Sequence, residues 1–330
     1  MDKVILLADP KSASWKFAEK IKNYISSKYS INVPLRELSI KMFASLEQDM
    51  ETMDNVRRKD VFFIHDSTKK PSDWWVELLI LKDALLSSSA ETVSFVLPNM
   101  LYSRKDWKDR SHVPITARAL ASSISPGLKR IITMDLHSAS IQGFYPESMP
   151  LDNLPSYPSV INHLKRNSSE FGELEKIVVV TPDVGGAKRA ANFAKNAGSE
   201  YPIAIVDKRR DPITGKTKSV NLVGDVKEKD CLILDDIIDS GGTLCDAAAL
   251  LKENGARKIY CFATHGLFTK GSEELCRSFD KVMTSNTYYR ENFPPIEIID
   301  MSSIFAEAIY QAQTGGSVSE LFKIKKEYSQ

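Results

Sequence analysis

Residues 232–244 combine three acids, two hydroxyl residues and two adjacent glycines in one short segment, Leu-Ile-Leu-Asp-Asp-Ile-Ile-Asp-Ser-Gly-Gly-Thr-Leu. Glycines at a strand-to-helix turn allow backbone N–H groups to close around a phosphate at the N-terminus of a helix. Carboxylates beside such a turn repel phosphate, but they accept hydrogen bonds from sugar hydroxyl groups. The segment therefore predicts a binding site for a ribose phosphate.

The same residues also suit an ordinary turn, because Asp-Ser-Gly-Gly favours tight turns and Ser or Thr often caps a helix. Here, however, the acids stand at the expected end of a buried strand, Leu232–Leu234, and a helical pattern follows from Leu244 to Leu251. Open α/β sheets bind their ligands at the carboxyl ends of strands. We therefore favour the binding site over the purely structural turn.

This segment resembles the phosphoribosyl pyrophosphate (PRPP) binding motif of type I phosphoribosyltransferase-like proteins. Its sequence, Asp-Asp-Ile-Ile-Asp-Ser-Gly-Gly-Thr-Leu, is most similar to that of the PRPP synthetase (ribose-phosphate pyrophosphokinase) family. The resemblance implies that three acids hold the ribose hydroxyl groups of ribose 5-phosphate, namely Asp235, Asp236 and Asp239. It also implies that the 5-phosphate is bound by Ser240, Gly241, Gly242 and Thr243.

Two further strand ends carry residues that suit a metal. Met134-Asp135-Leu136-His137, with Gln142-Gly143-Phe144 after it, resembles a family segment in which the histidine contacts the magnesium of Mg-ATP. Thr181-Pro182-Asp183 precedes a Gly-Gly turn, and the resemblance makes Asp183 a second contact for Mg²⁺, which favours oxygen ligands. The structural alternatives are an ordinary loop histidine and an aspartate at a helix N-terminus.

A run of charges, Asp207-Lys208-Arg209-Arg210-Asp211, directly follows a strand-like run. Such runs are usually solvated surface, but this one leads into a polar loop that contains glycine. It resembles the catalytic flexible loop of PRPP synthetases, which implies that Lys208 and Arg210 reach the transferring phosphates. Phosphoryl-type transfer needs positive charge on the phosphate oxygens more than it needs a strong base.

Residues 101–118 resemble the nucleotide loop of the same family, although Lys105 stands where the family has glutamine. The family segment Phe-Ser-Asp-Gly-Glu corresponds here to Phe43-Ala44-Ser45-Leu46-Glu47, and residues 47–58 predict a helix. The resemblance thus implies an ATP site made of Phe43, Glu47, Arg104, Lys105, Lys108, Asp109 and His137.

Positioning these residues requires strands that alternate with helices. Strand-like runs at Val4–Leu7, Val61–Ile64, Val93–Leu97, Ile131–Met134, Ile177–Val180, Ile203–Val206, Leu232–Leu234, Ile259–Ala263 and Ile296–Ile299 alternate with helical patterns such as Trp75–Leu86. This alternation predicts an α/β fold with mostly parallel sheets flanked by helices. A weak internal symmetry between residues 61–97 and 232–263 fits either two unrelated βαβ units or a duplicated domain.

Together with the resemblance, the pattern implies two tandem phosphoribosyltransferase-like (Rossmann-like) domains. We expect residues 1–150 to form the domain with the ATP loop and residues 151–301 the domain with the ribose 5-phosphate site. The proline-rich stretch 145–158 is the expected linker. A C-terminal helix within about 302–330 is expected to pack back on the first domain.

Composition narrows the class of protein. A chain of 330 residues with 44 basic and 43 acidic residues suits two domains and argues against a bulk nucleic-acid or membrane-surface protein. Its four cysteines include no C-x-x-C pair, so we expect buried thiols. No signal peptide or transmembrane stretch is visible, which makes the cytoplasm the expected location.

The resemblance implies Mg²⁺-dependent transfer of pyrophosphate from ATP to the C1 hydroxyl of ribose 5-phosphate, with release of AMP. It also implies a homo-oligomer, in which dimers assemble into hexamers. One alternative is a non-catalytic PRPP-synthetase-associated regulatory subunit, which the altered residues 43–47 and Lys105 favour. A base-adding phosphoribosyltransferase and a PRPP-sensing transcription regulator are further alternatives, but no basic N-terminal helix-turn-helix is visible.

Overall fold

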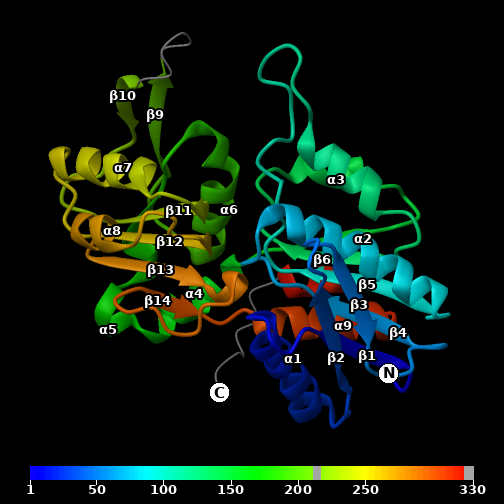
Figure 1. The fold of residues 1–330 in the computed structure, drawn as a ribbon. Helices are drawn as coiled ribbons and strands as arrows, with labels where there is room; N and C mark the ends of the chain where they lie inside the picture. The colour runs from blue at the N-terminus through cyan, green and yellow to red at the C-terminus, as the bar shows by residue number, and fades with distance from the viewer. Residues whose placement is uncertain (211–216, 323–330) are drawn as a thin grey trace. The chain divides into compact units, whose positions relative to one another are not determined.

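The computed structural model of the protein describes residues 1–210 and 217–322, and side chains are described for 1–207 and 221–322 (Figure 1). The chain divides into two compact units. Within the described residues, the first unit contains Met1–Pro155, Thr287–Tyr289 and residues 301–322, and the second contains Ser156–Asn286 and Arg290–Asp300.

A seven-stranded sheet forms the centre of the first unit, in the order β3-β2-β1-β4-β5-β6-β7. All neighbouring strands are parallel except β3, which runs antiparallel to β2. The inner strands are short apolar runs that are buried along their whole length, as expected for a sheet covered on both faces. The strands are β1 (Val4–Ala8), β2 (Leu35–Met42), β3 (Gln48–Thr52), β4 (Asp60–Ile64), β5 (Thr92–Leu97), β6 (Arg130–Met134) and β7 (Leu151–Leu154).

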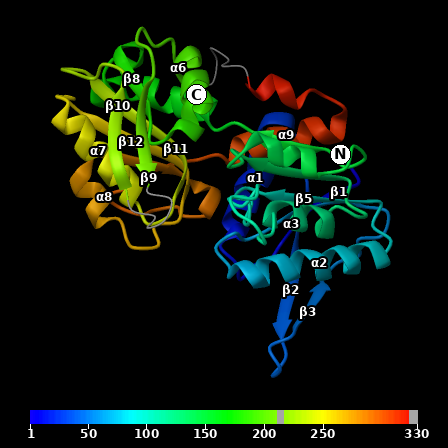
Figure 2. The same ribbon diagram turned by 90° about the horizontal axis from the view of Figure 1, so that it is seen from above.

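Helices cover both faces of this sheet (Figure 2). On one face, α2 (Pro71–Ser87) and α3 (Thr116–Ile124) bury leucine, isoleucine and tryptophan side chains against alternate residues of the inner strands. On the other face, α1 (Ser14–Tyr29) packs against α9 (Ser302–Thr314) through the rings of Phe17 and Phe305 and an ion pair between Lys28 and Glu307. The helix near the C-terminus thus belongs to the first unit.

The second unit repeats this plan with the order β10-β9-β8-β11-β12-β13-β14, in which only β10 is antiparallel to its neighbour. Its strands are β8 (Ile177–Thr181), β9 (Ala204–Arg210), β10 (Thr217–Val223), β11 (Asp230–Ile238), β12 (Ile259–Gly266), β13 (Lys281–Ser285) and β14 (Glu297–Ile299). Its helices are α4 (Tyr157–Arg166), α5 (Ser168–Phe171), α6 (Ala187–Ala197), α7 (Gly242–Glu253) and α8 (Glu273–Ser278). Short 3₁₀ turns are η1 (Ala139–Phe144), η2 (Leu174–Lys176), η3 (Val184–Gly186), η4 (Asn286–Tyr288) and η5 (Val318–Phe322).

The two sheets have the same strand order when β8 is matched to β1, so the predicted pair of mostly parallel α/β domains is confirmed. In each sheet the direction of winding reverses at one place, between β1 and β4 in the first and between β8 and β11 in the second. Such reversals are where open α/β sheets bind ligands, beyond the carboxyl ends of the strands.

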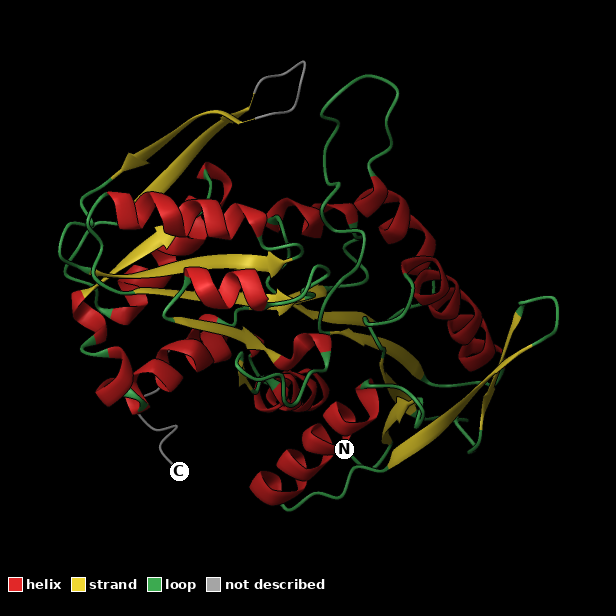
Figure 3. Ribbon diagram, turned by 60° about the vertical axis from the view of Figure 1, so that its left-hand side comes forward, coloured by secondary structure: helices red, strands yellow, loops and turns green. Residues whose placement is uncertain are grey.

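Several local predictions need correction. Residues 47–58 do not form a helix, because Gln48–Thr52 is strand β3, which forms a hairpin with β2 (Figure 3). The proline-rich stretch 145–158 is more than a linker, since Leu151–Leu154 pairs with β6 as the last strand of the first sheet. The patterns also failed to predict the strands β2, β10 and β13. Charged or polar residues interrupt or flank the apolar residues in all three strands, whose sequences are LRELSIKM, TKSVNLV and KVMTS.

Candidate active site

The glycine-rich segment of the second unit connects β11 to α7. Gly241 has a φ of +83°, a conformation that favours glycine, and α7 begins at Gly242 without a side-chain cap. A Cβ atom on Gly241 would lie 2.8 Å from Leu275 Cδ1, whereas one on Gly242 would have no atom within 4 Å. The fold therefore requires glycine at 241, and Gly242 leaves open space at the start of a helix, where anions bind well.

The acid pair lies inside β11, whereas the sequence pattern ended the strand at Leu234. The ladder between β11 and β8 stops at Ile233, but the ladder with β12 continues to Ile238. The acids Asp235 and Asp236 therefore lie on a strand that extends beyond one of its neighbours. This places both acids next to the point where the winding of the sheet reverses.

Arg189, in α6, provides the cation beside these acids. Its Nη1 lies 3.0 Å from Asp236 Oδ1 and 3.7 Å from Asp235 Oδ1. Burial and the neighbouring Asp236 charge nevertheless raise the pKa of Asp235 well above its ordinary value, and Arg189 opposes that shift. The two carboxyls are therefore difficult to ionise together, and hydroxyl donors or a cation beside them would stabilise the charged pair.

Asp239 is oriented by the loop that follows β12. Thr269 Oγ1 donates to Asp239 Oδ1 at 2.7 Å, and the Thr269 backbone N–H donates to the Asp239 carbonyl at 2.9 Å. Two hydrogen bonds from one residue fix both the backbone and the side chain of Asp239. Ser240 and Gly242 are exposed beside it.

Asp183 follows β8, the strand adjacent to β11 on the other side of the reversal. Its Oδ1 accepts a hydrogen bond from the Gly186 N–H at 3.0 Å, so the carboxylate caps the 3₁₀ turn η3. The side chain is exposed, and capping occupies one of its two oxygens. Both the capping role and the predicted metal role are therefore compatible with its position.

Lys208 and Arg210 lie on β9, which runs further than the sequence pattern indicated. Lys208 pairs with Val220 and Arg210 with Thr217 across the antiparallel ladder with β10. Their side chains, and residues 211–216 that follow in sequence, lie outside the described residues. The predicted catalytic roles therefore stay predictions.

In the first unit, the predicted nucleotide residues lie after the neighbouring parallel strands β5 and β6. His137 is exposed and follows Asp135, whose N–H donates to the Leu154 carbonyl at 3.0 Å. Arg104 is exposed on the loop after β5. Ser140, which follows His137, donates a 3.5 Å hydrogen bond to Asp106 on that loop, so the two segments are neighbours.

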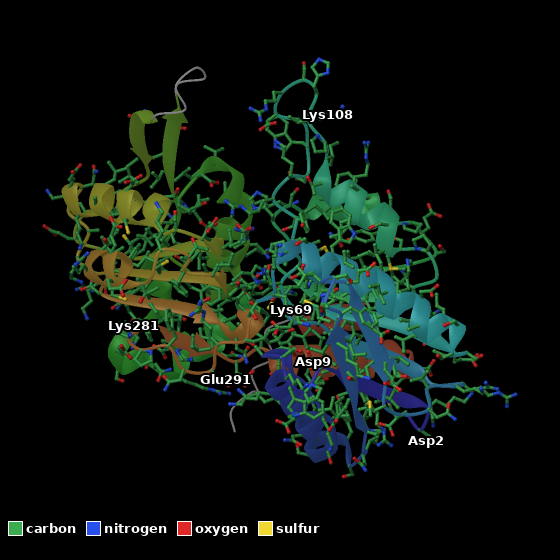
Figure 4. The ribbon with its side chains drawn as sticks, in the orientation of Figure 1. Asp2, Asp9, Lys69, Lys108, Lys281 and Glu291 are labelled. Atoms are coloured by element: carbon green, nitrogen blue, oxygen red, sulfur yellow. The ribbon has the colours of Figure 1, made fainter. Side chains whose placement is uncertain are left out.

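The rest of that loop carries Lys105, Lys108 and Asp109. Lys105 Nζ lies 2.5 Å from Asp109 Oδ1, and this hydrogen bond lowers the pKa of the Asp109 carboxyl. Lys108 is exposed at the far part of the loop (Figure 4). The loop thus presents cations to solvent, as a site for phosphate groups requires.

Phe43 and Glu47 lie apart from this loop in sequence, in the turn between β2 and β3. The Phe43 N–H donates to the Glu47 carbonyl at 2.8 Å, and Ser45 Oγ donates to Glu47 Oε2 at 2.7 Å. Leu46, where the family has glycine, has a φ of +68°. The turn therefore holds a leucine in a left-handed conformation that favours glycine.

The second unit therefore brings together Asp183, the three acids of residues 235–239 and the glycine turn. Among the described residues, no group of three or more His, Cys, Asp or Glu side chains is arranged to hold a metal by itself. Sequence reasoning missed the two residues that orient the acids, Arg189 and Thr269. A cation just after the Gly-Gly turn was a signal for Arg189, but no local signal marks Thr269.

The fold is that of a two-domain α/β protein of the phosphoribosyltransferase type, and its second unit carries three acids and a glycine turn where the winding of the sheet reverses. Residues 10–126 match the family model for the N-terminal domain of ribose phosphate pyrophosphokinase, and residues 202–323 match the model of the phosphoribosyl synthetase-associated domain. The chain belongs to the ribose-phosphate pyrophosphokinase, or PRPP synthetase, family, which confirms the predicted resemblance.

Relatives match over nearly their whole length. The chain is 37% identical over 299 residues to the ribose-phosphate pyrophosphokinase of Mesorhizobium japonicum, covering 88% of this chain and 94% of the relative. It is 36% identical over 315 residues to that of Campylobacter jejuni, covering 94% and 97%. The crystal structure of phosphoribosylpyrophosphate synthetase from Mycobacterium smegmatis matches with a TM-score of 0.81 and 29% identity, covering 95% of this chain and 100% of that one. In the part of this chain that the structure describes, no helix is long and apolar enough to span a bilayer.

Proposed function

We propose that the protein transfers pyrophosphate from ATP to ribose 5-phosphate. The C1 hydroxyl oxygen attacks the β-phosphorus, a new C1–O–P bond forms, and the bond between that phosphorus and the oxygen bridging to the α-phosphate breaks. The hydroxyl proton passes to solvent, and the products are PRPP and AMP. Two substrates that both carry phosphate repel one another, so holding them in line is the main catalytic task.

The second unit supplies the acceptor site in this proposal. Asp235, Asp236 and Asp239 accept hydrogen bonds from the ribose hydroxyl groups, and the turn Ser240–Thr243 binds the 5-phosphate at the start of α7. The open space beside Gly242 supports this assignment, as does the raised pKa of Asp235, because hydroxyl donors or a cation would stabilise its charged form. Arg189 and Thr269 hold the acids in place.

ATP binding and stabilisation of the transferring group are assigned to two further sets of residues. Arg104, Lys105, Lys108 and Asp109 bind ATP from the loop after β5, and Phe43 and Glu47 bind it from the turn between β2 and β3. Lys208 and Arg210 stabilise the charge that develops on the transferring group. These roles rest on the match of each segment to the family motif.

The donor set also fits Mg²⁺, which favours carboxylate oxygen and retains water. Asp183 has one carboxylate oxygen that is not used in capping η3. We propose that His137 and Asp183 hold Mg²⁺ with ATP. Bound there, the ion would neutralise phosphate charge during transfer.

One observation supports this function most strongly. The chain covers at least 94% of the length of the two relatives described above, and the β11–α7 segment keeps the acids and glycines that a ribose phosphate requires. A regulatory subunit without activity would have no need of the intact residues His137, Asp183 and Lys208. A base-adding phosphoribosyltransferase would need a hood over the base and no second domain.

The direct test incubates the purified chain alone with ATP, ribose 5-phosphate and Mg²⁺. We expect equimolar AMP and PRPP. Activity that appears only when a second synthetase chain is added would instead identify a regulatory subunit. Consumption of PRPP with a purine or pyrimidine base would identify a base-adding transferase.

We further propose a homo-oligomer built from dimers, and a cytoplasmic location where both substrates are available. Sedimentation of the purified chain with and without ATP measures the first property. A monomer that remains monomeric at saturating ATP while releasing AMP would contradict it.

A further inference from the structure

The turn between β2 and β3 has few contacts of its own. Phe43 is 55% exposed and Leu46 is 76% exposed, while only Leu38 and Met50 are buried within the two strands. β3 is an edge strand whose partner is β2. Because a two-stranded hairpin is marginally stable by itself, the position of this turn depends on what holds its base.

Gln48 holds the base. It directly follows Glu47 and pairs with Met42 across the hairpin. Its Nε2 donates to Glu77 Oε1 at 3.0 Å, whereas its Oε1 is buried without a hydrogen-bond partner in the described part of the chain. Met50, on the same face of β3, packs into the apolar cluster that contains residues of α2.

Glu77 is fixed in turn by a lysine. The Glu77 side chain is 3% exposed, and its two oxygens accept hydrogen bonds from Lys69 Nζ at 2.9 and 2.8 Å. Lys69 Nζ also lies 3.6 Å from Asp9 Oδ2 (Figure 4). Since Asp9 follows β1 and Lys69 follows β4, this chain of contacts connects the hairpin to the centre of the first sheet.

We infer that Glu77 is a positioning residue for the nucleotide: through Gln48 it holds the turn that carries Phe43 and Glu47, and Lys69 holds Glu77. This inference rests on the proposed function, in which Phe43 and Glu47 contact ATP. Without the link, the turn would sample other positions and the protein would have to order it each time ATP binds. The effect therefore falls on the apparent affinity for ATP.

The test compares Glu77→Gln and Gln48→Ala with the parent enzyme. Gln48→Ala removes a hydrogen bond to a charged group, and its loss should raise the KM for ATP about tenfold or more. Glu77→Gln keeps an acceptor for Gln48 but loses the charge that holds Lys69, so it should raise the same KM by a smaller factor. The kcat and the KM for ribose 5-phosphate should change by less than about twofold, since the ribose 5-phosphate site in the second unit is not affected. The double variant Gln48→Glu with Glu77→Gln exchanges donor and acceptor and should recover most of the loss.

Glu307→Gln is the matched control. Glu307 is also a nearly buried carboxylate of the first unit, paired with Lys28 at 2.5 Å, but it lies on α9. It should leave the KM for ATP unchanged. If the control raises the KM for ATP as much as Glu77→Gln does, the effect is general destabilisation and the inference is wrong.

Hydrogen exchange provides a readout that does not need activity. Amides of residues 41–49 should exchange faster in Gln48→Ala than in the parent chain, while those of β5 and β6 stay protected. Unchanged exchange together with an unchanged KM for ATP would overturn the inference. An inactive parent enzyme would refute the proposed function instead. The exchange experiment would still test whether Gln48 and Glu77 hold the turn.

Discussion

Gly242→Ala separates what the fold requires from what a ligand requires. An added Cβ at Gly242 would meet no atom within 4 Å, and no positive φ constrains the residue. At Gly241 the φ is +83° and the Cβ would lie 2.8 Å from Leu275 Cδ1. The folded chain therefore has a structural reason for glycine at 241 and none at 242, so the reason at 242 should be the bound phosphate.

The two substitutions should change the free energy of unfolding differently. Alanine is a better helix former than glycine by about 1 kcal/mol, so Gly242→Ala should leave stability unchanged or raise it by up to that amount. If its methyl group prevents one hydrogen bond to the phosphate, affinity should fall by about 1.5–3 kcal/mol, or about 10- to 150-fold. Gly241→Ala should instead cost about 2–5 kcal/mol of stability, from left-handed backbone strain and displacement of Leu275.

The assay is calorimetric titration of ribose 5-phosphate in the presence of Mg²⁺ and a non-hydrolysable ATP analogue, beside thermal unfolding of each variant. We expect Gly242→Ala to unfold at or above the parent temperature and to bind the sugar phosphate at least tenfold more weakly. Unaltered affinity in this variant would refute the claim that the phosphate approaches residue 242. A lower unfolding temperature would refute the claim that the fold tolerates a side chain there.

Three further predictions concern other parts of the chain. Lys208→Ala should lower the turnover number by about 100-fold or more without changing the circular dichroism spectrum, because positive charge on the transferring group is lost; an unchanged turnover number removes Lys208 from the mechanism. Leu46→Gly should raise the free energy of unfolding by about 1 kcal/mol, since Leu46 has a φ of +68°; denaturant unfolding with a lower midpoint would contradict this. The pKa of Asp235 is raised on folding, so the protonated carboxyl stabilises the folded chain relative to Asp235→Asn below about pH 4. This advantage is lost as the pH rises through the pKa of the folded state. Parallel pH profiles of the free energy of unfolding for the two chains would show that the carboxyl is not perturbed.

Much of the fold follows from apolar runs. The buried strands β1, β4, β5 and β8 are short runs of apolar residues, and these were predicted within one or two residues. Strand β3 was wrongly predicted as helix because its residues, Gln-Asp-Met-Glu-Thr, carry no apolar run or strand-forming preference. Only the pairing with β2 makes it a strand, and pairing is not a local property.

The site, like the fold, was predictable where it depends on local sequence and not where it depends on contacts between distant residues. The acids and glycines of residues 235–243 stand together in sequence, so their chemistry was predictable before their geometry was known. The contacts of Arg189 with Asp236 and of Thr269 with Asp239 bring together residues from different elements. The sequence also ended β11 at Leu234, because two adjacent acids are unusual inside a strand. The longer ladder with β12 explains their presence there.

The central claim is that residues 235–243 bind a pentose 5-phosphate. Calorimetric titration of the native chain with ribose 5-phosphate, beside ribose and inorganic phosphate at the same concentrations, tests this directly. We predict saturable binding of one ribose 5-phosphate per chain, and much weaker binding of either fragment. No heat with ribose 5-phosphate from a chain whose circular dichroism shows it to be folded would contradict the account.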